Sequence, residues 1–171
     1  INQSINQSIN QSINQSINQF FKAMRQLSLW ISVIFISILT SCSVEPEPIN
    51  YGDEQCDFCK MGVVDKAHSA QYVTKKGKQF KYDAIECLIR DISDSEIKEE
   101  DMAYLLVADY AHPGVMTDAK TATYLISKAI KSPMGAYLSA FAKVEDAQKT
   151  KGENDGELYD WEGIKAKISN N

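Results

Sequence analysis

The sequence predicts an α+β fold in which one compact domain contains two related strand–strand–helix–strand units. In each half of the chain beyond residue 52, two strand-like segments precede a helical pattern, and a third strand-like segment follows it. This repeated order indicates a pseudo-duplicated domain, although the two halves differ too much in sequence to count as a detected repeat. The chain beyond Cys42 has the usual length of a single domain.

The first unit begins with a predicted β-hairpin. Residues 62–64 and 69–74 predict one arm, residues 75–78 with their lysines and glycine predict the turn, and residues 79–82 predict the returning strand. Residues 102–110 form a longer apolar segment, which predicts a central strand of the sheet.

A helix is predicted between these strands. Asp83 and Glu86 have the spacing of a capping box, a pattern typical of a helix start. Cys87 lies off the apolar stripe of this helix, on the same side as Asp83, so it is available for chemistry. The stripe itself recurs at positions i, i+3, i+4 and i+7 through Ile85, Leu88, Ile89 and Ile92.

The second unit shows the same succession. Residues 121–126 and 136–141 predict two strands, residues 143–151 predict a short helix that ends at a glycine, and residues 157–160 predict the third strand. Residues 161–168 predict a closing helix.

The first residues of the chain are predicted to lie outside the mature protein. Residues 1–23 are dominated by an Ile-Asn-Gln-Ser repeat of low complexity, which cannot build a packed core. We interpret this repeat as upstream sequence that is not normally translated, with the true start at Met24. A genuine disordered leader is the alternative.

The next segment predicts export and a lipid anchor. Residues 24–41 resemble a bacterial lipoprotein signal peptide, because their apolar stretch is too short for a comfortable membrane crossing and they end just before Cys42. Lipidation of Cys42 would attach the protein to a membrane in the cell envelope, and we expect the outer membrane with the domain facing the periplasm. An uncleaved anchor helix is the alternative.

The part of the chain beyond Cys42 is acidic. Two of the 18 Lys and Arg residues precede Cys42, whereas all 23 Asp and Glu residues follow it. This balance, without a basic stripe, argues against nucleic acid as a partner. Residues 42–51, which contain Glu-Pro-Glu-Pro, predict an extended tether, and residues 52–171 predict a metal-binding domain.

A cluster of sulfur-containing residues follows the tether. Cys56 and Cys59 are three positions apart, and Met61 lies two positions further on. Thiolate and thioether ligands favour a soft ion such as Cu(I), and thioethers bind zinc poorly. Met134 lies between a proline and a glycine in a predicted turn, so we expect it to join Cys56, Cys59 and Met61 as a copper ligand. The alternative for each methionine is a place in the core.

A redox function is the main alternative for the two close cysteines. Without the lipidated Cys42 the chain has three cysteines, Cys56, Cys59 and Cys87, which cannot all pair within it. A Cys56–Cys59 disulfide with a buried Cys87 would suit a lipid-anchored thiol–disulfide oxidoreductase. The segment after Cys59 predicts a turn and a strand, however, so no helix dipole would lower a thiol pKa. This favours copper binding over redox catalysis.

The remaining polar residues argue against an enzyme. The sequence has no Ser/His/Asp order, phosphate-binding glycine loop or His-Glu-x-x-His motif. Its two histidines, His68 and His112, are predicted to lie at the surface, with His68 as an auxiliary copper ligand at most. We expect Asp83 and Cys87 to lie just outside the copper ligands and to orient them.

Several short motifs together carry a resemblance to a known family. They are Cys56-Asp57-Phe58-Cys59-Lys60-Met61, Phe80-Lys81-Tyr82-Asp83 with Cys87-Leu88, Asp109-Tyr110, Thr117-Asp118-Ala119 with Ala122-x-Tyr124, Met134-Gly135 with Ser139-Ala140-Phe141, and Gly156-x-Leu158-x-Asp160-Trp161. With these motifs, over about residues 52–168, the chain resembles the NosL family, lipoproteins that accompany nitrous oxide reductase.

The resemblance implies a fold and a function. The fold is a pair of ββαβ units with a topology similar to that of organomercurial lyase. The function is that of a copper chaperone, which delivers Cu(I) to an extracytoplasmic cuproenzyme, with nitrous oxide reductase or its assembly machinery as partner. Lys60 departs from the family pattern, which has Gly there. A lysine is expected to forbid a turn with positive φ, which weakens the assignment of Met61 as a ligand.

Overall fold

The computed structural model describes residues 19–22, 24–26, 44–95 and 97–169. The chain divides into two units, Ile1–Ser43 and Val44–Asn171. Within the first unit, residues 19–22 and 24–26 are helical, while the Ile-Asn-Gln-Ser repeat before them, the apolar stretch of the predicted signal peptide and Cys42 lie outside the described residues. No helix among the described residues is long and apolar enough to cross a membrane.

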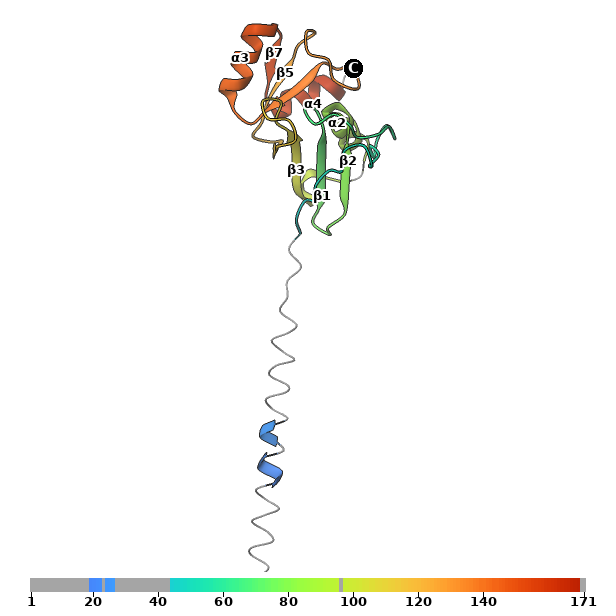
Figure 1. Cartoon of the computed structure of the whole chain (residues 1–171), viewed down its shortest axis with the longest axis vertical. Coiled ribbons are helices and arrows are strands. Elements are labelled where there is room, and N and C mark those ends of the chain that lie inside the picture. Colours follow the sequence, from blue (N-terminus) through green and yellow to red (C-terminus); the bar gives the residue numbers. More distant parts are fainter. Residues whose placement is uncertain (1–18, 23, 27–43, 96, 170–171) are drawn as a thin grey trace, which may run out of the picture. The chain divides into compact units, whose positions relative to one another are not determined.

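The unit Val44–Asn171 has the predicted α+β fold, with the ββαβ order present twice (Figure 1). The first half contains β1 (Ala70–Thr74), β2 (Gln79–Tyr82), α2 (Ile85–Asp94) and β3 (Met102–Ala108). The second half contains β5 (Thr123–Ile126), β6 (Leu138–Phe141), α3 (Val144–Asn154) and β7 (Glu157–Tyr159). Three further elements are the 3₁₀ helix η1 (Glu99–Asp101), β4 (Met116–Asp118) and α4 (Trp161–Ser169).

Each half builds its own antiparallel sheet. The first sheet has the strand order β2-β1-β3-β4, and the second has the order β6-β5-β7. An isolated parallel bridge between Asp109 and Ala140 links the end of β3 to β6, and α2 packs against α4. The apolar stripe predicted for α2 is confirmed, because Ile85, Leu88 and Ile89 are fully buried in the core that both halves share.

Some predicted boundaries differ from the observed ones. Residues 62–64 do not extend the hairpin, since only Gly62 forms an isolated bridge, with Gln55. Helix α3 continues through the glycine at which it was predicted to end and stops at Asn154. The turn that ends it requires Gly156, which has φ of 121° and would clash with the Ile126 carbonyl if it carried a Cβ.

Part of the predicted tether contacts the domain. The side chain of Gln79, at the start of β2, donates to the carbonyl of Glu45 and accepts from the amide of Glu47. Lys81 Nζ donates to the carbonyl oxygen of Pro48 at 2.9 Å, and Ile49 packs against the core. Residues 45–49 therefore lie along β2 instead of forming a free spacer.

Candidate metal site

Three thiols converge where the Cys-x-x-Cys loop meets the first turn of α2. The Sγ atoms of Cys56, Cys59 and Cys87 all lie within 4.8 Å of one another, and all three are free. Cys56 and Cys87 are fully buried, whereas Cys59 is partly exposed. The structure thus moves Cys87, which was expected only to orient the ligands, into the group of possible ligands.

Backbone hydrogen bonds shape the loop that carries Cys56 and Cys59. The amide of Cys56 donates to the carbonyl of Met61 at 2.7 Å, and the amide of Lys60 donates to the carbonyl of Cys56 at 2.9 Å. Lys60 has φ of 64°, so the expectation that a lysine would forbid this turn is wrong. The loop hydrogen bonds, and a bond from Lys60 Nζ to the carbonyl of Asp57, hold the lysine in a conformation that glycine adopts more easily.

The same loop is fastened to β2. The amide of Asp57 donates to the carbonyl of Lys81 at 2.9 Å, and the amide of Lys81 donates to Asp57 Oδ2 at 2.8 Å. Lys81 Nζ also donates to Glu54 Oε1 at 2.7 Å, which anchors the segment just before Cys56. These contacts, all made by the protein itself, hold the cysteine loop against β2.

The predicted capping box is wrong. Helix α2 begins after Ala84, which makes no side-chain cap. Asp83 Oδ1 accepts instead from the amides of Val64 and Asp65 at 2.7 and 3.0 Å, which holds the segment that leaves the cysteine loop. Glu86 Oε1 accepts from the hydroxyl of Ser132. Both carboxylates therefore bind residues far away in the chain, and neither caps the start of α2.

Hydrogen bonding within the cluster separates the three thiol pKa values. A hydrogen bond from the Cys87 thiol lowers the pKa of Cys56 from 9.0 to about 5, and backbone amides, including that of Asp83, add to this effect. The bond to Cys56 raises the pKa of Cys87, and burial raises the pKa of Cys59. The cluster therefore favours ionisation of Cys56 over that of Cys59 and Cys87, and the thiolate is the form that binds a metal.

The two methionines predicted as ligands differ in their surroundings. The Met61 side chain is 47% exposed, although its backbone closes the cysteine loop. Met134 is partly buried and packs against the core cluster that includes Cys56 and Cys87. Met134 therefore lies in a turn that is held against the helix start carrying Cys87, whereas the Met61 side chain is half-exposed.

The two histidines are held by aspartates of their own loops. His68 is buried, contrary to the surface position predicted for it, and its two ring nitrogens lie 2.9 Å from Asp65 Oδ2 and 3.2 Å from Ser139 Oγ. His112 is exposed as predicted and lies 2.7 Å from Asp109 Oδ2. Neither belongs to the group of close metal-binding side chains that the described residues form. Because both nitrogens of His68 have partners, it offers no free lone pair to an ion.

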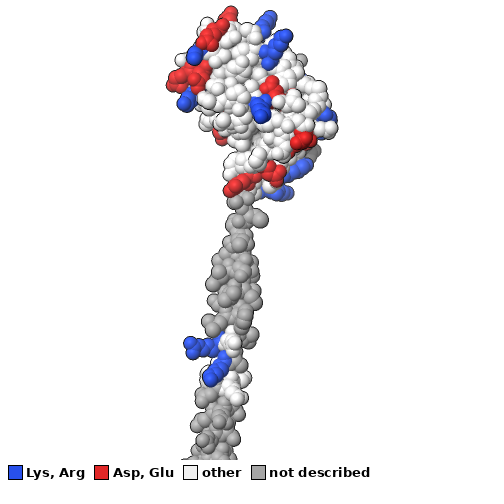
Figure 2. Space-filling view, in the orientation of Figure 1, with Lys and Arg blue, Asp and Glu red and all other residues white. Residues whose placement is uncertain are grey.

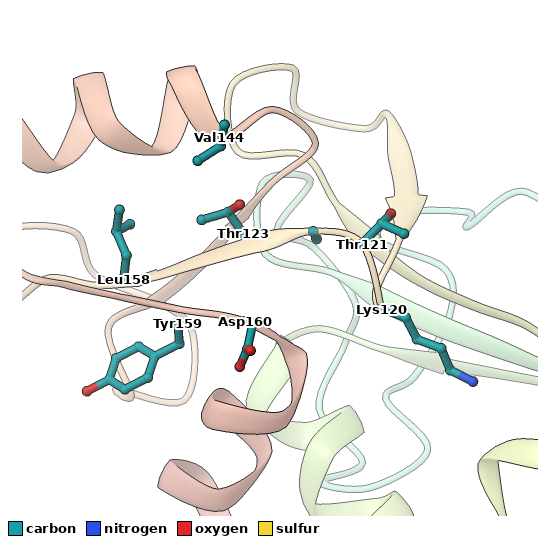
Figure 3. Close-up of a pocket in the computed structure, with 8 residues that line it drawn as sticks. Lys120, Thr121, Thr123, Val144, Leu158, Tyr159 and Asp160 are labelled. Carbon is teal, nitrogen blue, oxygen red and sulfur yellow. The ribbon is translucent and has the colours of Figure 1, made fainter.

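A hollow of about 550 Å³ near β5 and β7 is a separate feature (Figure 3). Val144, Thr123 and Leu158 lie on one side of these strands, and Tyr159 and Asp160 on the other. Its charged residues already have partners, since Lys120 pairs with Glu99 at 3.4 Å and Asp160 accepts from the amide of Gly163. Its lining residues include no thiol, thioether or imidazole, so it offers no set of metal donors like that of the thiol cluster.

Figure 2 shows how charged side chains are distributed on one face of the molecule. Acidic and basic side chains are interspersed there, and large areas carry neither. A polyanion would be favoured by a continuous basic stripe, which this face lacks among the described residues.

Sequence reasoning missed two residues that shape the site. The sequence predicts no role for Lys81 beyond its place in the Phe80-Lys81-Tyr82-Asp83 motif. For Glu86 the sequence predicts only a place in a capping box. The one local signal for Glu86 was its position beside Cys87, since its partners lie almost fifty residues further along the chain.

Comparisons with known proteins agree with this picture. The family model NosL matches residues 48–169. Among solved structures, the crystal structure of the copper chaperone NosL from Shewanella denitrificans matches with a TM-score of 0.60 and 18% sequence identity, over 70% of this chain and 95% of that chain. At this identity the likeness shows a shared fold. A comparison with curated proteins gives no match.

Proposed function

The chain belongs to the NosL family, and we propose that it carries Cu(I) on the cluster of Cys56, Cys59 and Cys87 and hands the ion to a cuproenzyme. The observation behind this proposal is the convergence of three free thiols within 4.8 Å. Such a soft donor set suits a carrier of a monovalent ion and needs no catalytic machinery. The similar protein from Shewanella denitrificans is itself a copper chaperone.

The donor set favours Cu(I) over zinc. A structural zinc site closes with four ligands, whereas the group found among the described residues has three thiols and neither a histidine nor a carboxylate. Cu(I) accepts two or three sulfur ligands, and a thioether such as that of Met134 would add another soft donor. Low coordination would also keep the ion exchangeable.

Burial suggests the route by which the ion leaves. Cys59 is the partly exposed member of the cluster, while Cys56 and Cys87 are fully buried. A thiol or imidazole of the recipient would therefore replace Cys59 first, and Cys56 would release the ion afterwards. The recipient we propose is nitrous oxide reductase or its assembly machinery.

A thiol–disulfide oxidoreductase is the second candidate, because the pKa of Cys56 lies at about 5. The burial of the thiols argues against it. A redox enzyme needs its low-pKa thiol exposed to the substrate, yet Cys56 is fully buried and the more exposed Cys59 has a raised pKa. Because the thiol with the lowered pKa is buried and the more exposed thiol has a raised pKa, a metal carrier is favoured over a redox enzyme.

The lipid anchor at Cys42 is part of the same proposal. Attachment of the chain to the cell envelope would place the domain where extracytoplasmic cuproenzymes are loaded. Mass spectrometry of the mature N-terminus tests it, since acyl chains on Cys42 are expected and an unmodified Cys42 in the membrane fraction would contradict it.

The copper proposal is tested on the full chain with Cys42→Ala, below called the reference protein, so that the fourth thiol cannot bind copper. The reduced reference protein is titrated with Cu(I) against a chromophoric chelator, without oxygen. One tight site that zinc does not displace supports the proposal. A failure to compete for Cu(I), combined with a reversible Cys56–Cys59 disulfide, would leave the oxidoreductase ahead.

A further inference from the structure

We infer that Glu86 is a positioning residue, which holds the turn that carries Met134 against the first turn of α2. Glu86 immediately precedes Cys87 and is fully buried. This inference rests on the proposed function, because the position of Met134 matters for affinity only if copper binds at the thiol cluster.

One carboxylate oxygen of Glu86 joins both sides of that turn. Glu86 Oε1 accepts from Ser132 Oγ at 2.7 Å and from the amide of Ala136 at 3.2 Å. These two donors lie two residues before and two residues after Met134. A single acceptor on α2 thus fixes the base of the turn, and Met134 lies at its apex.

The turn is itself rigid, so fixing its base fixes its apex. The amide of Gly135 donates to the carbonyl of Ser132 at 3.1 Å, which closes a four-residue turn. Pro133 fixes its own φ, and Gly135 has φ of 77°, which a glycine adopts without strain. Met134 therefore has little backbone freedom once Glu86 holds the turn.

A buried carboxylate is a costly way to fasten a loop. Glu86 Oε2 has no hydrogen-bond partner among the described residues, although it is buried. An apolar side chain would fill such a space at lower cost, because burial of an acid whose oxygens are not all paired is unfavourable. A carboxylate at this position has a use that an apolar side chain lacks. Glu86 lies directly beside Cys87 in the chain, so its hydrogen bonds connect the turn of Met134 to the helix start that carries a thiol of the cluster.

The test is a double-mutant cycle for Cu(I) affinity in the reference protein. The variants are Glu86→Ala, Met134→Ala and their combination, with Glu86→Gln as the conservative change. Glutamine keeps an oxygen that can accept both hydrogen bonds. Glu145→Ala, at the equivalent second position of the exposed helix α3, is the matched control.

We expect Glu86→Ala to weaken Cu(I) binding by roughly 10- to 100-fold, the range for residues that orient metal ligands. The same change in the Met134→Ala background should have no further effect, because Glu86 acts through Met134. Glu86→Gln and Glu145→Ala should stay within about threefold of the reference protein, since they leave the turn fixed. An equal loss in both backgrounds, or no loss at all, would overturn the inference.

Two further measurements keep the test decisive. If Glu86→Ala does not fold, Ser132→Ala removes one of the two bonds and should show the same dependence on Met134 with a smaller loss. The ¹³C-methyl resonance of Met134 is then followed in the protein without copper. Glu86→Ala or Ser132→Ala should shift it towards the position of a free methionine, and an unchanged resonance would contradict the inference. This second readout needs no copper, so it also separates failure of the inference from failure of the proposed function.

Discussion

Helix α2 of the first ββαβ unit begins with five consecutive buried residues, Ile85–Ile89, whereas α3 of the second unit has one buried residue, Ala147. The two helices hold the same place in the order of elements. The first turn of α2 is enclosed because the cysteine loop and the turn of Met134 both contact it. The start of α3 carries the exposed Glu145 and the partly buried Asp146. The two units therefore share the order of their elements, but not the candidate site. The site is formed by the cysteine loop and the turn of Met134, which both pack on the start of α2.

Removal of a thiol from the first unit should have the largest effect. Cys56→Ala deletes the thiolate of the cluster, so Cu(I) affinity should fall by more than about 100-fold, beyond the range for residues that only orient ligands. Competition titration of the reference protein measures it. Asp146→Ala, at the third position of α3 where α2 has Cys87, is the control and should leave the affinity unchanged. Similar Cu(I) affinities for Cys56→Ala and Asp146→Ala would contradict the placement of the copper site in the first unit.

The difference in burial predicts a difference in stability. Leu88→Ala leaves a cavity under α2 and should lower the free energy of unfolding by about 2–5 kcal/mol. Val144→Ala, at the 44% exposed start of α3, should change it by no more than about 0.5 kcal/mol. Urea unfolding of the two variants tests this. Equal losses would show that α3 contributes to the core as much as α2 does.

The pH dependence of the thiols sharpens the comparison. Because the pKa of Cys56 is about 5 instead of 9.0, the folded protein carries fewer protons there than the unfolded chain between these values. Cys56 therefore stabilises the fold increasingly as pH rises above about 5, and this stabilisation is lost as pH falls through 5. Ultraviolet thiolate absorbance of the metal-free reference protein should show one thiol titrating near pH 5.

The same titration identifies the cause of that pKa. Cys87→Ala removes the main hydrogen bond to Cys56, so the midpoint should move upward, while Cys59→Ala should leave it low. A midpoint that Cys87→Ala does not move would mean that the start of α2 plays no part in the ionisation of the cluster.

The smallest expected effect concerns the loop of the first unit. Lys60→Gly relieves a residue with φ of 64° and loses the bond from Nζ to the carbonyl of Asp57. The two effects partly cancel, so stability should rise by about 1 kcal/mol or less. Thermal unfolding checks it, with Lys75→Gly in the hairpin turn as the control for the loss of a lysine. A decrease would show that the lysine side chain contributes more than its backbone strain costs.

The sequence predicted local features well where periodicity and spacing carried the information. The apolar stripe of α2, the hairpin at β1 and β2, and the Cys-x-x-Cys pair all follow from neighbours within a few residues. The roles of Asp83 and Glu86 could not be predicted, because their partners lie far away in the chain while a capping box is a local pattern. The approach of Cys87 to Cys56 likewise depends on how the cysteine loop packs on α2.

The central claim is that the thiol cluster at the start of α2 is where the protein holds copper. Anomalous diffraction at the copper edge, from crystals of the reduced, Cu(I)-loaded reference protein, tests it most directly. We predict one strong peak among the sulfurs of Cys56, Cys59 and Cys87, on the side of Met134. A peak elsewhere, for example beside the exposed His112, with none at the cluster, would contradict the account.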